Sequence, residues 1–152
     1  MSVECLTFDV TEGVANLRLN RPSASNALNL DLCETLERAA KACAGDDTVR
    51  AIHISATGER FCVGGDLEEV RQVGDRGEHL RKLASAFHTA VICLTEQDAP
   101  IIISVGGVAA GAGFSLALIA DVMLASPRAK FVSAYTQIGY SPAGGLTHTL
   151  PR

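Results

Sequence analysis

The sequence predicts an α/β fold in which crossover connections join most of the strands. Short β-branched runs alternate with longer segments of helical periodicity, in the order strand–strand–helix, strand–helix–strand–helix and then strands. The 152 residues are 47% hydrophobic and 20% charged, which is typical of a chain that buries a core within one domain. No fixed-period repeat and no low-complexity linker divides the chain.

The first half begins with two strands, whose connection Glu12-Gly13 favours a hairpin turn. Asn29 or Asp31 is expected to cap the helix that follows, and Glu34 stands three residues after Asp31 as in a capping box. Gly45 and two aspartates end that helix. The elements expected here are strands at residues 6–10 and 14–19, a helix at 29–44 with Leu32, Leu36, Ala39 and Cys43 on its apolar face, and a strand at 51–56.

The second half contains one long amphipathic helix. Its apolar residues recur with a period near 3.6, at Leu80, Leu83, Ala84, Phe87, Val91 and Leu94. The elements expected in this half are helices at 67–73 and 78–95, a strand at 101–105, a helix from about 112, strands near 122–125 and 130–132, and an irregular Gly/Pro/Thr-rich end at 139–152.

Residues 99–120 contain no charge over 22 positions, which raises the alternative of a membrane span. Pro100, two serines and four glycines interrupt this segment, and its β-branched run at 101–105 is short. A buried strand, a loop and a buried helix are therefore predicted, and no membrane association.

Charge and cysteine usage exclude several classes of protein. Lys and Arg number 13 against 17 Asp and Glu, so the net charge of −4 provides no footprint for nucleic acid. Five scattered cysteines without a C-x-x-C pair favour buried free thiols over disulfides or a zinc site, and no metal site is predicted. Residues 1–10 carry Glu4 and Asp9, so no signal peptide is expected and a cytoplasmic location is predicted.

Two glycine-rich turns, at 61–67 and 107–115, each follow a strand and open a helix. Small residues let backbone N–H groups approach a ligand, and the first N–H groups of a helix are unpaired. Two such turns side by side would bind one developing oxyanion. Phosphate binding is an alternative, although neither turn matches a P-loop or a dinucleotide fingerprint, and tight helix–sheet packing is another.

Four segments together resemble the crotonase superfamily, the enoyl-CoA hydratase/isomerase family, in its order and spacing across nearly the whole chain. They are Asn20-Arg21-Pro22 with Asn26-Ala27-Leu28-Asn29, then 61–67, 107–121 and 139–145. The resemblance implies a crotonase-like (ClpP/crotonase) spiral of β-β-α units, here as one core domain over 1–152 truncated at its C-terminus. It also implies an acyl-CoA substrate from fatty acid metabolism, no covalently bound cofactor, and a homotrimer or hexamer in the full-length protein.

The resemblance assigns roles to individual positions. The backbone N–H groups of Gly65 and Ala112 would form the oxyanion hole. Asp66 would lie near the adenine end of coenzyme A, with helix capping as an equally weighted alternative. The positions implied to bind the substrate or coenzyme A are Ser23, Ser25, Ala27, Gly64, Gly65, Asp66, Leu67, Gly111 and Ala112.

The sequence departs from the family where catalytic carboxylates are expected, because those positions hold Ser115, Tyr135 and Ala143. Tyr135 is a poor base at neutral pH but a possible acid, and Ser115 either orients a water or only packs. The four histidines are expected to be structural or exposed. Glu68, Glu69, Asp75 and Glu78 are interpreted as a solvated helix face.

Three functions remain open. The first is an acyl-CoA enzyme of hydratase/isomerase type. The second is a coenzyme A-binding paralogue with little or no turnover, and the third is a member with other thioester chemistry.

Overall fold

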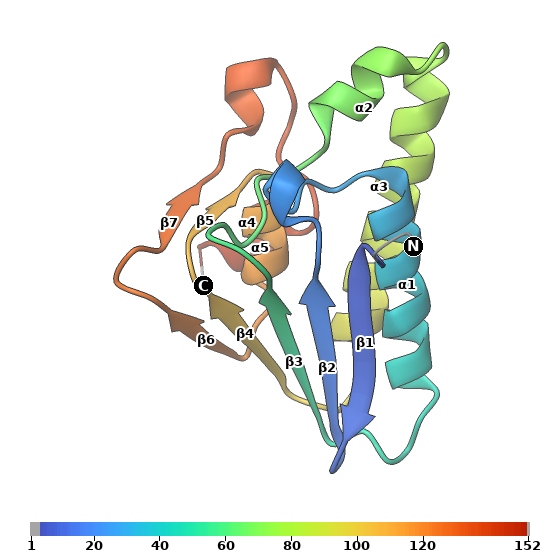
Figure 1. Ribbon diagram of the computed structural model, residues 1–152, viewed down its shortest axis with the longest axis vertical. Coiled ribbons are helices and arrows are strands. Elements are labelled where there is room, and N and C mark those ends of the chain that lie inside the picture. Colours follow the sequence, from blue (N-terminus) through green and yellow to red (C-terminus); the bar gives the residue numbers. More distant parts are fainter. Residues whose placement is uncertain (1–3, 152) are drawn as a thin grey trace.

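The computed structural model describes residues 4–151. Its largest sheet has five strands in the order β1-β2-β3-β4-β6 (Figure 1). The β1–β2 pair is antiparallel and the other three pairs are parallel. A second sheet pairs β5 with β7 in parallel. The strands are β1 (Leu6–Thr11), β2 (Val14–Leu19), β3 (Ala51–Ala56), β4 (Ile101–Val105), β5 (Val108–Ala110), β6 (Val122–Ala125) and β7 (Lys130–Val132). Parallel neighbours require crossovers, and this confirms the predicted α/β class.

Helices α1 and α3 pack against each other, and α1 also contacts β1 and β2 (Figure 1). The predicted apolar face of α1 is buried, with Leu32 and Leu36 fully inaccessible to solvent, and it joins strand residues such as Ile52 and Ile54 in one core. The helices are α1 (Leu30–Ala44), α2 (Leu67–Gln72), α3 (Arg76–Thr95), α4 (Ala112–Ala117) and α5 (Leu146–Thr149), with 3-10 helices η1 (Pro22–Ala24) and η2 (Tyr135–Ile138).

Two local predictions near the N-terminus are confirmed. Glu12 and Gly13 both adopt positive φ, 52° and 80°, which matches the twist that a two-residue hairpin turn needs. Of the two candidate caps for α1, Asn29 is the one used, since its Oδ1 accepts a hydrogen bond from the N–H of Leu32 at 3.0 Å. Asp31 lies in the first turn of the helix instead.

Three predictions about element bounds are wrong. Strand β5 lies inside the segment predicted as a glycine-rich turn. Helix α3 begins at Arg76 because Asp75 caps it, with Oδ1 accepting from the N–H of Glu78 at 2.8 Å. The end at 139–152 is not wholly irregular: α5 forms after Gly145, whose φ of 79° turns the chain so that Leu146 is buried. Residues 1–3 and 152 of the predicted domain lie outside the described residues.

The uncharged segment at 99–120 folds as predicted into a strand and a helix, with β5 between them. Over residues 4–151, no helix has the length and apolar character that crossing a bilayer requires.

Asn26 ties the segment before α1 to the loop that follows β3. Its side chain is fully buried, and its φ of 55° is in the left-handed region. Its Oδ1 accepts from the N–H of Arg21, and its Nδ2 donates to the carbonyls of Thr57 and Arg60, each at 2.8 Å. Three backbone groups therefore depend on one amide.

Replacing Asn26 with Ala is expected to lower the free energy of unfolding by about 2–4 kcal/mol, because it leaves those backbone groups without a partner. Urea denaturation measures this loss. The matched control is Asn16→Ala, whose amide donates only to the exposed Asp9 carboxylate and to Val14 O at 3.5 Å, and which should cost about 0.5 kcal/mol or less. Equal losses in the two variants would contradict the assignment.

Candidate active site

The two glycine-rich turns lie side by side, as the sequence predicts. The N–H of Cys62 donates to the carbonyl of Val108 at 3.1 Å, and the N–H of Ala110 donates to the carbonyl of Cys62 at 2.9 Å. Two residues after Cys62, a methyl group placed on Gly64 would lie 3.4 Å from the backbone nitrogen of Ala112. The first turn is therefore in van der Waals reach of the start of α4.

The N–H groups of Gly65 and Ala112 are both free to bind a ligand. Among residues 4–151, neither donates to a backbone or side-chain acceptor. Gly65 lies between two paired residues, since Leu28 donates to the carbonyl of Gly64 at 2.8 Å and accepts from Asp66 at 2.9 Å. Ala112 is the first residue of α4, where helix geometry leaves the N–H unpaired.

Gly65 and Ala112 both line one cavity of about 350 Å³. Its wall is largely apolar and comes from α2, α3 and η2, including Leu67, Val70 and Phe87. Leu80 and Ala84, predicted as part of the buried stripe of α3, line this cavity and are only partly buried. A small apolar cavity whose lining includes two residues with unpaired backbone N–H groups suits a ligand that has a polar oxygen beside an apolar group.

Ser115 and Tyr135 form a buried hydroxyl pair in which Ser115 Oγ lies 2.8 Å from Tyr135 Oη. Ser115 Oγ also donates to the carbonyl of Ala143 at 2.8 Å. The three positions at which the resemblance expects carboxylates are thus brought together. Burial raises the pKa of Tyr135, and its hydrogen bonds with the Ser115 hydroxyl and to the carbonyl of Ala143, at 3.3 Å, oppose this without reversing it. Tyr135 lines the cavity and is protonated at neutral pH.

The positions predicted to bind coenzyme A divide into two groups. Gly64, Gly65, Leu67, Gly111 and Ala112 line the cavity. Ser23, Ser25, Ala27 and Asp66 lie outside its lining. Ser23 is exposed in η1, and the hydroxyl of Ser25 accepts from the guanidinium of Arg60 at 2.6 Å.

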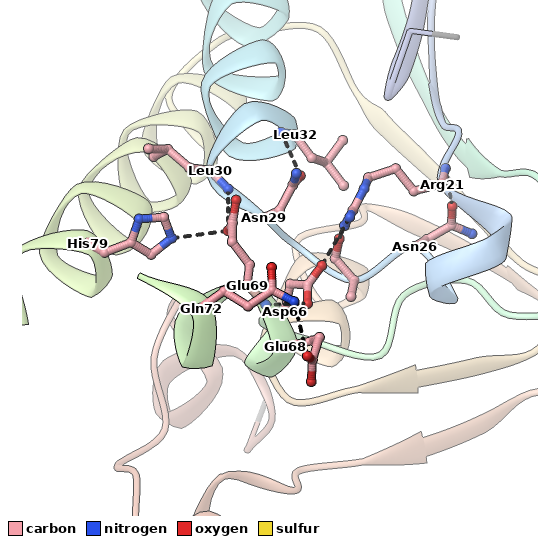
Figure 2. Close-up of polar contacts among 11 residues, drawn as sticks. Arg21, Asn26, Asn29, Leu30, Leu32, Asp66, Glu68, Glu69, Gln72 and His79 are labelled. Carbon is pink, nitrogen blue, oxygen red and sulfur yellow. Dashed lines mark hydrogen bonds and ion pairs between the residues drawn. The ribbon is translucent and has the colours of Figure 1, made fainter. Parts of the chain in front are cut away.

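Asp66 has the capping role that the sequence left open. Its Oδ1 accepts from the N–H of Glu69 at 3.1 Å and its Oδ2 pairs with Arg21 at 3.0 Å (Figure 2). Burial would raise the pKa of Asp66, but the backbone hydrogen bond and the guanidinium outweigh it and lower that pKa. The carboxylate stays ionised and anchors the start of α2.

The interpretation of Glu69 as part of a solvated face is wrong. Its Oε2 accepts from the N–H of Leu30 at 3.1 Å and lies 3.0 Å from Nε2 of His79 (Figure 2). Only 27% of the Glu69 side chain and 13% of the His79 side chain are exposed. Leu30 and His79 lie 39 and 10 positions from Glu69, so the helical pattern around Glu69 does not indicate these contacts.

The cysteines are free thiols in the described residues, as predicted, and four of the five are buried. Cys62 lies within the first turn, where burial raises its pKa to about 12. Its thiol is therefore protonated at neutral pH and is no nucleophile.

The chain belongs to the enoyl-CoA hydratase/isomerase family, because the model of that family matches residues 9–152. It is 36% identical over 149 residues to a trans-2-decenoyl-[acyl-carrier-protein] isomerase of Streptococcus mutans, covering 96% of this chain and 57% of the relative. It is 36% identical over 152 residues to a 1,2-epoxyphenylacetyl-CoA isomerase of Escherichia coli, covering 99% of this chain and 58% of that protein. The chain thus spans less than two thirds of the length of these relatives.

The fold is also that of solved relatives. A crystal structure of an enoyl-CoA hydratase from Mycobacterium smegmatis superposes with a TM-score of 0.83 at 34% identity, over 90% of this chain and 53% of that one. The predicted crotonase-like fold is confirmed.

Adjacent glycines should respond differently to a methyl group. Gly64→Ala is expected to destabilise the fold by about 1–3 kcal/mol, since Gly64 has a φ of 94° and the methyl would lie 3.0 Å from the carbonyl of Ala110. Gly65→Ala, with ordinary φ and nothing within 4 Å, should change stability by about 0.5 kcal/mol or less. Thermal unfolding of both variants measures this. A stable Gly64→Ala protein would argue against the close approach of the two turns.

Proposed function

We propose that this chain forms the thioester-binding part of an acyl-CoA enzyme of hydratase/isomerase type. The observation that carries the proposal is the pair of unpaired amides, at Gly65 and Ala112, on one cavity. Both would donate to the thioester carbonyl oxygen as negative charge develops there. Removal of one such donor typically costs about 10²–10³-fold in rate.

Coenzyme A would enter as part of the substrate, with no covalently bound cofactor. Gly64, Gly65, Leu67, Gly111 and Ala112 would surround the acyl-thioester end. Ser23, Ser25, Ala27 and Asp66 would contact the coenzyme A portion outside the cavity. This second assignment rests on the family resemblance, with the Leu28–Gly65 bridge as the physical connection between the two groups.

Tyr135 would supply a proton to the substrate, with Ser115 orienting its hydroxyl. The support is the place of Tyr135 in the cavity lining and the 2.8 Å contact between its hydroxyl and that of Ser115. General acid catalysis typically contributes ~10²–10⁴-fold. The alternative is a coenzyme A-binding paralogue of low activity, and the absence of a carboxylate at Ser115, Tyr135 and Ala143 favours it.

The remaining expectations are proposals that rest on family membership. They are a cytoplasmic location, a role in fatty acid metabolism, and a homotrimer or hexamer.

Proline at position 112 removes the Ala112 amide. Ala112 is the first residue of α4, a position where proline is tolerated because its N–H is unpaired there. We expect Ala112→Pro to lower kcat by about 10²–10³-fold with a smaller change in butyryl-CoA affinity. Crotonyl-CoA hydration and 3-enoyl-CoA isomerisation assays measure the rate. Ala112→Ser keeps the N–H and is the control; if both variants lose equal activity, the amide is not the donor.

The proton donor has its own test. Tyr135→Phe should lower kcat by about 10²-fold while the dissociation constant of butyryl-CoA, from calorimetry, stays within about three-fold. Unchanged turnover would exclude Tyr135 as the acid. Tight butyryl-CoA binding without turnover in the unsubstituted protein would support the inactive paralogue, and activity gained by Ser115→Glu with Tyr135→Glu would identify the lost carboxylates as the cause.

A further inference from the structure

We infer that Glu69 is a positioning residue, which holds α2 against two other helices and so fixes the cavity wall and the Gly65 amide. This inference rests on the proposed function, since it concerns the geometry of that same site. Glu69 has no place in the acid–base roles considered above, and its side chain lies outside the cavity lining.

The contacts of Glu69 join three helices at one carboxylate oxygen. Oε2 accepts from the N–H of Leu30, the first residue of α1, at 3.1 Å. The same oxygen lies 3.0 Å from Nε2 of His79 in the first turn of α3 (Figure 2). Since Glu69 itself belongs to α2, its side chain is the point at which α2 is fastened to the two long helices.

The Asp66 cap and the Arg21–Asp66 ion pair hold the start of helix α2, and Glu69 adds a contact further along the helix. Helix α2 has six residues, and Val70 is its only buried one. An isolated helix of this length is unstable in water, because too few hydrogen bonds repay the cost of starting it. It is followed by an extended residue, Val73, and then by Gly74, so the chain beyond it adds no rigid support.

The N-terminus of α1 is a favourable place for the Glu69 carboxylate. The N–H of Leu30 has no partner within its own helix, and the positive end of the α1 dipole lies there. A hydrogen bond to an ionised carboxylate is stronger than one between neutral groups. Asn29 already caps Leu32, so Glu69 pairs a second N–H group of the same turn.

The position of α2 decides the geometry of the site at two points. Leu67 and Val70 project from α2 into the cavity wall. Gly65 lies directly before Asp66, the N-cap of α2. The hydrogen bonds of Leu28 to Gly64 and Asp66 place Gly65 beside the start of α1, and Glu69 joins α2 to that same end of α1 three residues after Asp66. A shift of α2 would therefore move both the wall and the direction of the Gly65 amide.

The first test needs no ligand. In the intact protein, Glu69→Ala should speed hydrogen exchange of the Val70 amide by at least about ten-fold relative to the unsubstituted protein. Glu68→Ala is the matched control, because that neighbouring carboxylate contacts only the exposed Gln72 and Arg71 of its own helix. Glu69→Gln, whose amide oxygen can still accept, should recover most of the protection. Exchange unchanged in Glu69→Ala would overturn the inference.

The second test measures hydrogen bonding to a ligand bound in the site. Difference infrared spectroscopy of bound butyryl-CoA measures how far the thioester carbonyl stretch is lowered by hydrogen bonds. In Glu69→Ala, we expect the decrease in carbonyl stretching frequency to be at most about half of that in the unsubstituted protein, and the affinity for butyryl-CoA to be about ten-fold weaker. Glu69→Gln should be close to the unsubstituted protein in both. A folded Glu69→Ala protein with the full lowering would show that Glu69 has a purely structural role. If the carbonyl frequency of butyryl-CoA is not lowered in the unsubstituted protein, the proposed function is wrong. The hydrogen-exchange test would still decide whether Glu69 holds α2 in place.

If Glu69→Ala does not fold, His79→Ala removes the link to α3 and leaves the cap on Leu30. It should show smaller changes in hydrogen exchange and in carbonyl frequency. His79→Gln, which keeps an amide donor, should return both values toward those of the unsubstituted protein. Values for His79→Ala equal to those of the unsubstituted protein in both measurements would contradict the inference.

Discussion

The site depends on the close approach of two backbone segments. One is residues 59–62, which lead into the first glycine-rich turn, and the other is residues 107–113 of the second turn. A methyl group on Gly107 would fall 1.9 Å from the carbonyl oxygen of Glu59, and one on Gly113 would fall 2.2 Å from that of Cys62. No side chain fits at these two positions without moving the backbone. Because glycine allows this contact, the two turns open toward the same cavity.

The sequence predicts most of what is local in this arrangement. The hairpin at Glu12-Gly13, the Asn29 cap and the helical periodicities each follow a short-range rule. The two turns are recognisable because glycine clusters where a strand meets a helix. The resemblance of four segments to one family then predicts that Ser115 and Tyr135 occupy two positions where the family carries carboxylates, and in the fold their hydroxyls lie 2.8 Å apart.

Long-range contacts and very short elements escape such rules. Strand β5 has three residues, too few for an alternating pattern to be recognised. Helix α5 is one turn long and begins after two glycines that indicate a loop. Glu69 resembles its exposed neighbour Glu68 in sequence, and only the tertiary fold brings Leu30, 39 positions earlier, to its carboxylate.

The polar groups of the candidate site fall into two sets: hydrogen-bond donors in the cavity lining and carboxylate acceptors outside it. The cavity lining includes Gly65 and Ala112, whose unpaired backbone N–H groups suit a developing negative charge. It also includes Tyr135, whose hydroxyl is hydrogen-bonded to Ser115 and to the carbonyl of Ala143. The nearby carboxylates, Asp66 and Glu69, already accept backbone hydrogen bonds and pair with Arg21 and His79. The lowered pKa of Asp66 makes it a weak base.

This separation affects how loss of either carboxylate should be interpreted. An acid or base that acts on the substrate must reach it, whereas Asp66 and Glu69 are outside the cavity lining and bound to the scaffold. If Glu69 positions α2 as we infer, its removal shifts α2 without removing a group proposed to transfer protons. A lower rate in such a variant would therefore report on geometry. Under the proposed function, a change to the Tyr135 hydroxyl would instead report on proton transfer itself.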